Sequence, residues 1–221
     1  MNTFRHRGSL GDIIYSIPCI LASGGGKLNL EKKFHYDSLN SLLSVQPNLE
    51  IGYGREGISL DGFRKINDNK KHLGQCHAEV LNVTVDLTKE WLFNIDPLKE
   101  AEIIVNRSRH YHDRKEIDYS LLRDYKDKIL FIGKGDEYRS FRRYFVPEVK
   151  HRPCKDGLEI ARLIKGSKLF IGNQSFCFSL AEAMKHPRAL EICYTYDNCR
   201  PSGNNWYITL TKDIINTCLS K

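Results

Sequence analysis

The sequence predicts an α/β protein built on parallel β-sheets. Its second half alternates short apolar runs, typical of buried strands, with amphipathic runs, typical of helices. Its first residues form a strand pattern that passes through a glycine turn directly into an apolar helix pattern. A length of 221 residues allows one large domain or two compact ones, and 41% hydrophobic with 28% charged residues is typical of a globular protein.

The first half is predicted to begin with a strand, a turn and a helix. The strand covers residues 2–7 and the turn Gly8–Gly11, and the helix covers 12–23. The helix ends at three glycines, 24–26, which suit the left-handed conformation found after helix C-termini.

The remaining first-half elements are less regular. A strand is predicted at 27–30 and a helix at 36–46, ended by Pro47. Residues 49–78 are weakly periodic and predict mostly loops, whereas 79–87 alternate as in a strand.

The second half predicts strands that alternate with helices, which favours right-handed parallel β-α-β connections. The strand runs are 101–108, 128–133, 168–173 and 188–194; the helical runs are 120–127, 156–167, 179–187 and 211–221. The break near 94–100 predicts two domains, 1–98 and 99–221.

The composition restricts partner and compartment. A net charge of +7 favours anionic partners such as nucleotides, phosphorylated sugars or nucleic acid, although a basic solvated surface explains it equally well. Seven scattered cysteines without a CxxC pair indicate neither a disulfide framework nor a zinc site. With no signal peptide and no apolar run of membrane-spanning length, we expect a cytoplasmic protein with reduced thiols.

Polar loops follow four of the predicted strands. Ligands of open α/β sheets bind beyond the carboxyl ends of the strands, so these loops are the candidate binding elements. Their sequences are RGSLGD (7–12), NRSRHYHDR (106–114), GKGDEYRSF (133–141) and GNQSFCFSLAE (172–182).

The first loop has two interpretations. Gly8, Ser9 and Gly11 allow a ligand to approach the backbone at a helix N-terminus, where unpaired N–H groups favour anions. The spacing matches neither the dinucleotide-binding nor the P-loop motif. Asp12 is a candidate catalytic carboxylate, but Asp12 or Ser9 also suits a simple helix cap.

The middle loops carry the basic candidates. A guanidinium group can bind two phosphate oxygens at once, so these loops could bind a phosphate. A basic loop that is simply exposed to solvent has the same composition. Gly133 and Lys134 suit either a phosphate or an ordinary turn. The basic side chains of the second loop are Arg107, Arg109, Arg114, His110 and His112.

The fourth loop predicts a nucleotide-binding corner. Gly172, Asn173, Gln174 and Ser175 lead from a strand into a helix whose N-terminus suits a diphosphate. Glu182 lies one to two turns into that helix, where it could accept hydrogen bonds from a ribose diol or simply be a surface residue.

Two of these stretches resemble a known family. GSLGDIIYSIP resembles the N-terminal signature of the heptosyltransferase-like glycosyltransferases, a GT-B group, and FIGNQSFCFSLAEAM is similar to their second signature. The resemblance implies a compact GT-B-type arrangement of two Rossmann-like domains facing a cleft. It also implies a nucleotide-sugar donor held mainly by the second domain, a glycan or other hydroxyl-bearing acceptor, and neither metal nor other cofactor.

The resemblance assigns roles to particular residues. It makes Asp12 the general base on the acceptor hydroxyl, beside an acceptor or phosphate loop at Gly8, Ser9 and Gly11. It gives the 172–175 corner to the nucleotide and Glu182 to the ribose, while Arg107 and Arg109 would stabilise the leaving diphosphate.

The second signature also departs from the family pattern. Gln174 stands where many members have Asp, Phe176 where they have Gly, and Ser179 where they have His. These departures argue against heptose as the sugar. They also favour one alternative, a non-catalytic module that binds a nucleotide or nucleotide sugar.

A nucleic-acid acceptor is the other alternative. The stretch EYRSFRRYF (137–145) mixes basic and aromatic residues, as in sites where bases stack and phosphates are neutralised. The same stretch fits an amphipathic helix with its Phe and Tyr residues in the core.

Overall fold

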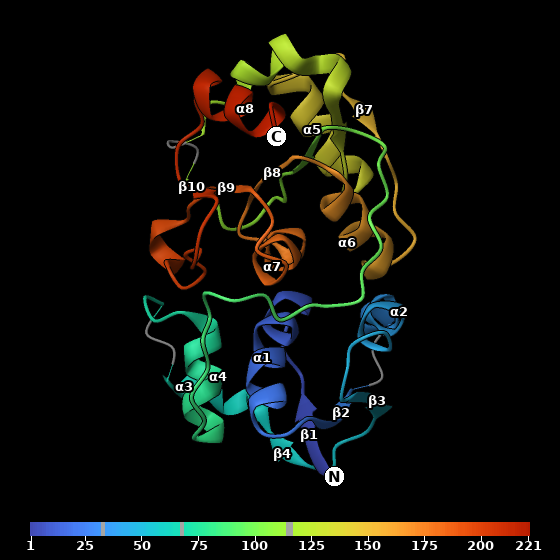
Figure 1. Ribbon diagram of the computed structural model, residues 1–221, viewed down its shortest axis with the longest axis vertical. Coiled ribbons are helices and arrows are strands. Elements are labelled where there is room, and N and C mark those ends of the chain that lie inside the picture. The colour runs from blue at the N-terminus through green and yellow to red at the C-terminus, as the bar shows by residue number, and fades with distance from the viewer. Residues whose placement is uncertain (32–33, 67–68, 114–116) are drawn as a thin grey trace.

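The computed structural model describes residues 1–31, 34–66, 69–113 and 117–221. Figure 1 shows two layered units one above the other: the chain begins in the lower one and ends in the upper one. The segment that joins them crosses between the two units.

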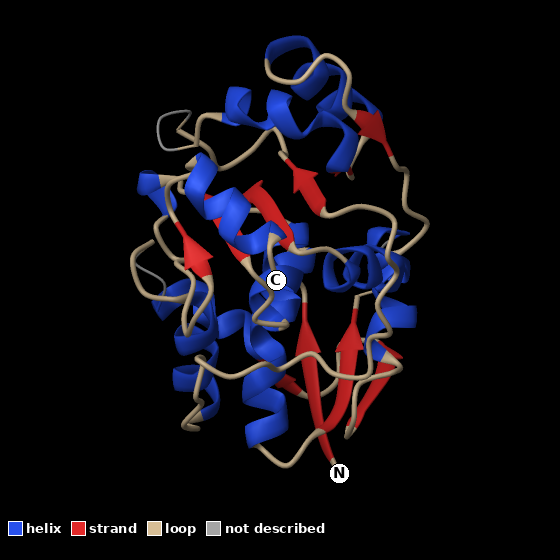
Figure 2. Ribbon diagram, turned by 45° about the horizontal axis from the view of Figure 1, so that its top comes forward, coloured by secondary structure: helices blue, strands red, loops and turns tan. Residues whose placement is uncertain are grey.

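The N-terminal half contains a parallel sheet in the order β3-β2-β1-β4. The strands are β1 (Asn2–His6), β2 (Gly26–Leu30), β3 (Leu49–Tyr53) and β4 (Ile58–Ser59). The carboxyl ends of β1 and β2 point toward the C-terminal half (Figure 2), so the loops that follow them face it. The helices are α1 (Leu10–Ala22), η1 (Phe34–Leu39), α2 (Asn40–Leu43), η2 (Leu60–Gly62), α3 (Phe63–Ile66) and α4 (Leu73–Leu81).

The C-terminal half contains a second parallel sheet, in the order β10-β9-β8-β5-β6-β7. Its strands are β5 (Ile103–Asn106), β6 (Ile129–Phe131), β7 (Lys150–His151), β8 (Leu169–Asn173), β9 (Arg188–Glu191) and β10 (Trp206–Tyr207). The central strands β5 and β8 are buried at every position, as their continuous apolar sequences predict. The helices are η3 (Tyr119–Lys128), α5 (Gly135–Tyr144), α6 (Gly157–Gly166), α7 (Phe176–Ala183), η4 (Tyr194–Tyr196) and α8 (Lys212–Leu219).

Helix α1 is buried on several sides because it packs on both α4 and α7. Its apolar residues join those of α7 in one hydrophobic cluster that runs through both halves. Trp91 lies in the same junction: its indole Nε1 donates to the carbonyl of Ile14 at 3.1 Å, and its backbone N–H donates to Ala183 at 2.9 Å. The two halves are therefore joined by a shared apolar core as well as by the connecting chain.

Most of the strands and helices expected in the second half are present, but several first-half predictions were wrong. Residues 49–78 form β3, β4 and short helices instead of loops, and 79–87 continue α4 before leaving it at Asn82. Asn82 has a φ of 51°, so it ends the helix in the left-handed conformation. The expected helix at 36–46 is the end of the 3₁₀ helix η1 followed by the short α-helix α2. In the second half, the expected helix at 120–127 lies within the 3₁₀ helix η3.

Candidate functional site

The turn after β1 is closed by a capping box. The Ser9 backbone N–H donates to Oδ2 of Asp12 at 2.8 Å, and the Asp12 N–H donates to the Ser9 hydroxyl at 3.4 Å. The helix therefore begins at Leu10, two residues before the expected start. Asp12 does cap the helix, but within the described structure its other carboxylate oxygen, Oδ1, accepts no hydrogen bond.

Asp12 is a mostly buried carboxylate beside an arginine. Its side chain is 18% exposed, and Nη2 of Arg64 lies 3.6 Å from Oδ2. Burial raises the pKa of Asp12, while the hydrogen bonds from Ser9 and the charge of Arg64 oppose that rise. Asp12 therefore binds a proton more readily than an ordinary aspartate, as a general base needs to do.

Asp61, which follows β4, accepts hydrogen bonds from residues on both sides of Asp12. Its carboxylate accepts from the backbone N–H of Arg7 at 3.0 Å and from Nη1 of Arg64 at 2.9 Å. Arg64 is thereby held between two carboxylates, those of Asp12 and Asp61. Sequence reasoning missed Asp61 and Arg64 because they fall in the stretch expected to be loop.

Two buried histidines, His6 and His77, lie next to the glycine turn. Nδ1 of His6 accepts from the Gly8 N–H at 2.8 Å, and the His6 ring centroid lies 5.2 Å from that of His77. Burial lowers the pKa of His6 to about 4, so the ring stays neutral and keeps this acceptor. A side chain at position 8 would put its Cβ 2.4 Å from the His6 ring, which explains the glycine.

The turn lies against the C-terminal half. A Cβ built on Gly11 would lie 3.8 Å from the Ser179 hydroxyl of α7. The negative charge of Asp12 also contributes to raising the pKa of Tyr111 and of Cys199, although burial is the main cause in both. The glycine turn thus meets helix α7, which starts at the Asn-Gln-Ser corner, across the junction between the two halves.

Asn173 acts mainly on the loop that follows β5. Its Oδ1 accepts from the Ser108 N–H at 2.8 Å, and its Nδ2 donates to the Ser108 hydroxyl at 3.0 Å and to the His110 carbonyl. The side chain is completely buried. Asn173 therefore holds the 108–111 backbone in place.

Gln174 and Ser175 have similar internal partners. Gln174 Oε1 accepts from the Cys193 N–H at 2.8 Å, and Nε2 donates to the Tyr196 carbonyl at 2.6 Å. Ser175 caps α7 and donates to Oδ1 of Asn106 at 2.9 Å. Gly172, in β8, pairs with both neighbouring strands. The second signature thus fixes two loops around the N-terminus of α7.

The two predicted arginines differ in their freedom. Arg107 is 9% exposed and forms a two-bonded ion pair with Glu191, at 2.8 and 2.9 Å. Arg109 is 63% exposed, with its Nε 3.2 Å from Asp136. Arg109 can turn toward a ligand, whereas Arg107 is fixed by its ion pair with Glu191. Arg114 lies outside the described residues.

A polar pocket of about 370 Å³ opens beside these arginines. Glu137 lies on its wall, and one oxygen of Glu137 accepts from the Lys134 N–H at 2.9 Å. Gly133 makes the adjoining turn with a φ of 134°, and Lys134 is exposed at the start of α5. The pocket is lined by Arg107, Ser108, Arg109, His112, Glu137, Ser140, Phe141 and Tyr144.

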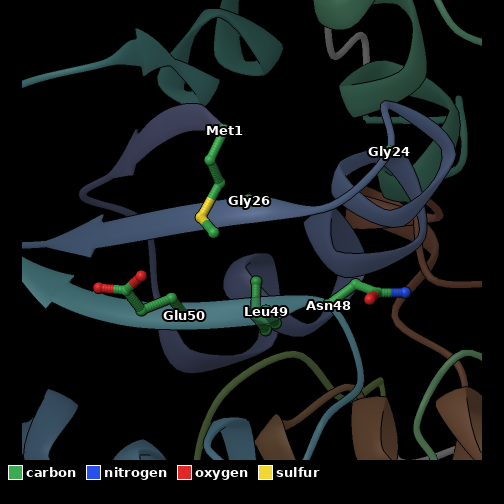
Figure 3. Close-up of a pocket in the computed structure, with 6 residues that line it drawn as sticks. All are labelled: Met1, Gly24, Gly26, Asn48, Leu49 and Glu50. Atoms are coloured by element: carbon green, nitrogen blue, oxygen red, sulfur yellow. The ribbon is translucent and has the colours of Figure 1, made fainter.

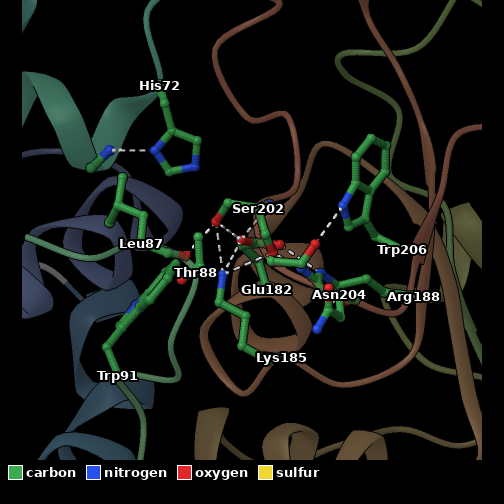
Figure 4. Close-up of polar contacts among 12 residues, drawn as sticks. His72, Leu87, Thr88, Trp91, Glu182, Lys185, Arg188, Ser202, Asn204 and Trp206 are labelled. Atoms are coloured by element: carbon green, nitrogen blue, oxygen red, sulfur yellow. Dashed lines mark hydrogen bonds and ion pairs between the residues drawn. The ribbon is translucent and has the colours of Figure 1, made fainter.

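Glu182, for which the resemblance predicted ribose binding, is buried among internal partners. It is 0% exposed, Arg188 Nε donates to its Oε2 at 2.5 Å, and the Ser202 N–H donates to its Oε1 at 3.1 Å. Lys185 pairs with it as well, and Figure 4 shows this buried cluster around Ser202. Both oxygens of Glu182 already accept hydrogen bonds inside the protein, an arrangement that favours a structural role over ribose binding. The pocket carboxylate that sequence reasoning missed is Glu137.

A second hollow, of about 300 Å³, lies beside the amino ends of the strands in the N-terminal sheet, away from the Ser9–Asp12 turn (Figure 3). It is lined by Met1, Gly24, Gly26, Asn48, Leu49 and Glu50, which lie at the amino ends of β1, β2 and β3. Because ligands of parallel sheets bind at the carboxyl ends, this hollow is not the candidate site.

The part of the chain that the structure describes contains neither a metal-binding cluster nor a membrane-spanning helix. No group of three or more His, Cys, Asp or Glu side chains in that part of the chain is placed to hold a metal ion. No helix in the described ranges is long and apolar enough to cross a membrane.

Among the comparisons with known proteins, those with solved structures identify the fold. No protein-family model matches the sequence, and no curated protein matches it. Among solved structures, Escherichia coli heptosyltransferase WaaC with ADP has a TM-score of 0.66 at 12% identity, over 100% of this chain and 99% of that one. A glycosyl transferase family 9 protein from Veillonella parvula has a TM-score of 0.61 at 12% identity, over 95% of this chain and 86% of that one.

A third match is TibC from enterotoxigenic E. coli, described as a bacterial iron-containing dodecameric glycosyltransferase. Its TM-score is 0.60 at 15% identity, over 95% of this chain and 63% of that one. The predicted fold class is therefore confirmed: the chain has the α/β fold of GT-B-type glycosyltransferases, with two parallel Rossmann-like sheets.

Proposed function

We propose that the protein is a glycosyltransferase that moves a sugar from a nucleotide-sugar donor to an acceptor hydroxyl, with Asp12 as the general base. The observation that carries this proposal is the position of Asp12. A mostly buried carboxylate with a raised pKa stands at the junction of the halves, close enough to Tyr111 and Cys199 for its charge to act on both side chains.

The donor nucleotide belongs in the polar pocket of about 370 Å³. Arg109, whose exposed guanidinium can turn from Asp136 into the pocket, supplies positive charge to the diphosphate as it leaves. Arg107 lines the pocket wall, where it is held by Glu191. With Arg109 in this role, the proposed reaction needs no metal ion at the leaving group. Glu137, which has one oxygen outside its hydrogen bond to Lys134, accepts from the ribose diol in place of Glu182.

The acceptor hydroxyl binds next to Asp12. A carboxylate within hydrogen-bond reach removes the hydroxyl proton as the new bond forms, which is typically worth roughly 10²–10⁴-fold in rate. Three of the solved matches contain ADP, ADP-heptose or an ADP-heptose analogue, so ADP-heptose is the first donor to test despite the departures in the second signature.

The nucleic-acid alternative has less support. The basic-aromatic stretch is helix α5, and its Phe141 is buried in the core. Tyr138 packs flat against His151 with ring centroids 4.5 Å apart. These two rings are not available for base stacking, although Tyr144 is exposed.

The test starts with a thermal-shift screen of ADP, GDP, UDP and CDP and of their sugars, including ADP-heptose, GDP-mannose and UDP-glucose. Ligands that bind the folded state raise its apparent stability. Each donor that binds is then incubated with mixed oligosaccharides or with nucleic acid, and products are identified by mass spectrometry.

The variant Asp12→Asn tests the base. Its side-chain oxygen can still accept from Ser9, so we expect intact folding and nucleotide binding with at least a 100-fold loss of transfer. The matched control is Asp213→Asn, the same change in the first turn of α8, which should keep full activity. Full transfer by Asp12→Asn would exclude Asp12 as the base, and nucleotide binding without any transfer would favour a binding module.

A further inference from the structure

Three exposed tyrosines lie on the loops that the second signature holds. Tyr111, Tyr194 and Tyr196 are 51%, 48% and 41% exposed. The rings of Tyr111 and Tyr196 are 5.3 Å apart and nearly perpendicular, at 82°. Such an edge-to-face pair leaves one aromatic face open to a ligand.

Tyr111 also has an unusual backbone conformation. Its φ is 55°, and apart from Lys185 the other described non-glycine residues with positive φ are all asparagines. A bulky residue in the left-handed region is strained and persists only when its surroundings hold it there. Such strain gathers at ligand-binding sites, which makes the Tyr111 ring a candidate contact.

Buried side chains supply the restraint. Nδ2 of Asn173 lies 3.5 Å from the Tyr111 carbonyl and also donates to the His110 carbonyl. Nε2 of Gln174 donates to the Tyr196 carbonyl at 2.6 Å. The protein thus uses two buried amides to present two exposed rings.

The position of the rings relates them to the donor. Arg107, Ser108, Arg109 and His112 line the polar pocket, and Tyr111 belongs to the same loop. Tyr111 is also near enough to Asp12 for that charge to act on its phenol. A ligand with its diphosphate beside the arginines would therefore place its sugar between the pocket and Asp12.

We infer that Tyr111 and Tyr196 bind the sugar of the nucleotide-sugar donor by packing against the C–H face of its ring. This assignment rests on the proposed function and adds the residues that select the sugar. An aromatic face removes the C–H groups from water, while the hydroxyls at the rim of the sugar stay solvated.

The test is the contribution of the sugar to affinity, measured by calorimetry. ADP is compared with ADP-heptose, UDP with UDP-glucose and GDP with GDP-mannose, in the wild type and in Tyr111→Asn. Asparagine accepts the left-handed backbone, so this variant removes the ring and keeps the loop. Tyr196→Ala removes the ring of Tyr196. Two variants serve as controls: Tyr111→Phe keeps the ring of Tyr111 and loses only its hydroxyl, and Tyr144→Ala changes the wall of the polar pocket.

We expect Tyr111→Asn and Tyr196→Ala to weaken nucleotide-sugar binding by about 5–10-fold and to change the affinity for the bare nucleotide by less than twofold. Tyr111→Phe should bind both ligands like the wild type. Tyr144→Ala should weaken the nucleotide and its sugar conjugate by the same factor.

Equal weakening of both ligands by Tyr111→Asn, or no weakening of either, would overturn the inference and leave the proposed function standing. If the wild type binds none of the nucleotides or nucleotide sugars, the proposed function fails, and the inference fails with it.

Discussion

Ser9 and Asp12 each satisfy a backbone N–H of the other, at 2.8 and 3.4 Å. This reciprocal pair starts helix α1 and fixes the Asp12 carboxylate in a single orientation. The capping and catalytic interpretations of Asp12 are therefore compatible, because the cap uses Oδ2 and leaves Oδ1 for a substrate.

Loss of the Ser9 hydroxyl should lower stability. We expect Ser9→Ala to reduce the free energy of unfolding by about 1 kcal/mol, the usual cost of losing an N-cap. Urea denaturation measures this, with Ser9→Thr as the control because it keeps a capping hydroxyl. A loss equally large in Ser9→Thr would show that the hydroxyl bond is not the cause.

Arg64 should set the lower pH limit of activity. Burial raises the pKa of Asp12 and Arg64 lowers it, so removing the guanidinium should raise that pKa further. A base works in its ionised form, so the acid limb of the kcat profile should lie at higher pH in Arg64→Ala than in the wild type. The acid limb of Arg64→Lys should lie between those of Arg64→Ala and the wild type. An unchanged limb in Arg64→Ala would mean that Asp12 is not the titrating group.

Glu182 should matter for stability and not for nucleotide affinity. Glu182→Gln leaves the buried Arg188 without its carboxylate, and breaking a buried pair in this way costs about 3–5 kcal/mol. Denaturation measures the loss, and the double variant Glu182→Leu with Arg188→Met should be more stable than Glu182→Gln. If the Glu182→Gln variant folds normally but loses nucleotide binding, the ribose role predicted from sequence is restored.

His6 should make stability depend on pH. Its pKa is lowered by burial to about 4 in the folded protein, against 6.5 in the unfolded chain. The unfolded state therefore binds the proton first, so this stabilisation is complete above pH 6.5 and is lost as the pH falls toward 4. The difference corresponds to about 3 kcal/mol.

The measurement compares the wild type with His6→Asn, whose amide oxygen can still accept from Gly8. Urea denaturation at pH 7.5 and 4.5 should show a smaller stability loss in the variant. Equal losses in both proteins would assign the acid sensitivity to other groups.

The strands and loops of the second half could be predicted because their apolar runs are continuous and end in glycine and polar residues. Helix α4 could not, since its buried positions include His77, which breaks the apolar pattern. The four loops that were predicted to bind ligands do include the pocket and Asp12. The sequence could not reveal which polar side chains have internal partners. Asn173 and Gln174 are bonded to residues 19 to 65 positions away. Glu182 is bonded to Arg188, 6 positions away, and to Ser202, 20 positions away.

Trp91 has a consequence for turnover. Its ring is tied to α1 and its backbone to α7, within apolar side chains shared by both halves. Wide separation of the two halves would break the hydrogen bonds of Trp91 and expose the apolar side chains of the junction to water. We therefore expect the two sheets to stay together throughout the cycle, so that substrates enter and products leave without separation of the halves.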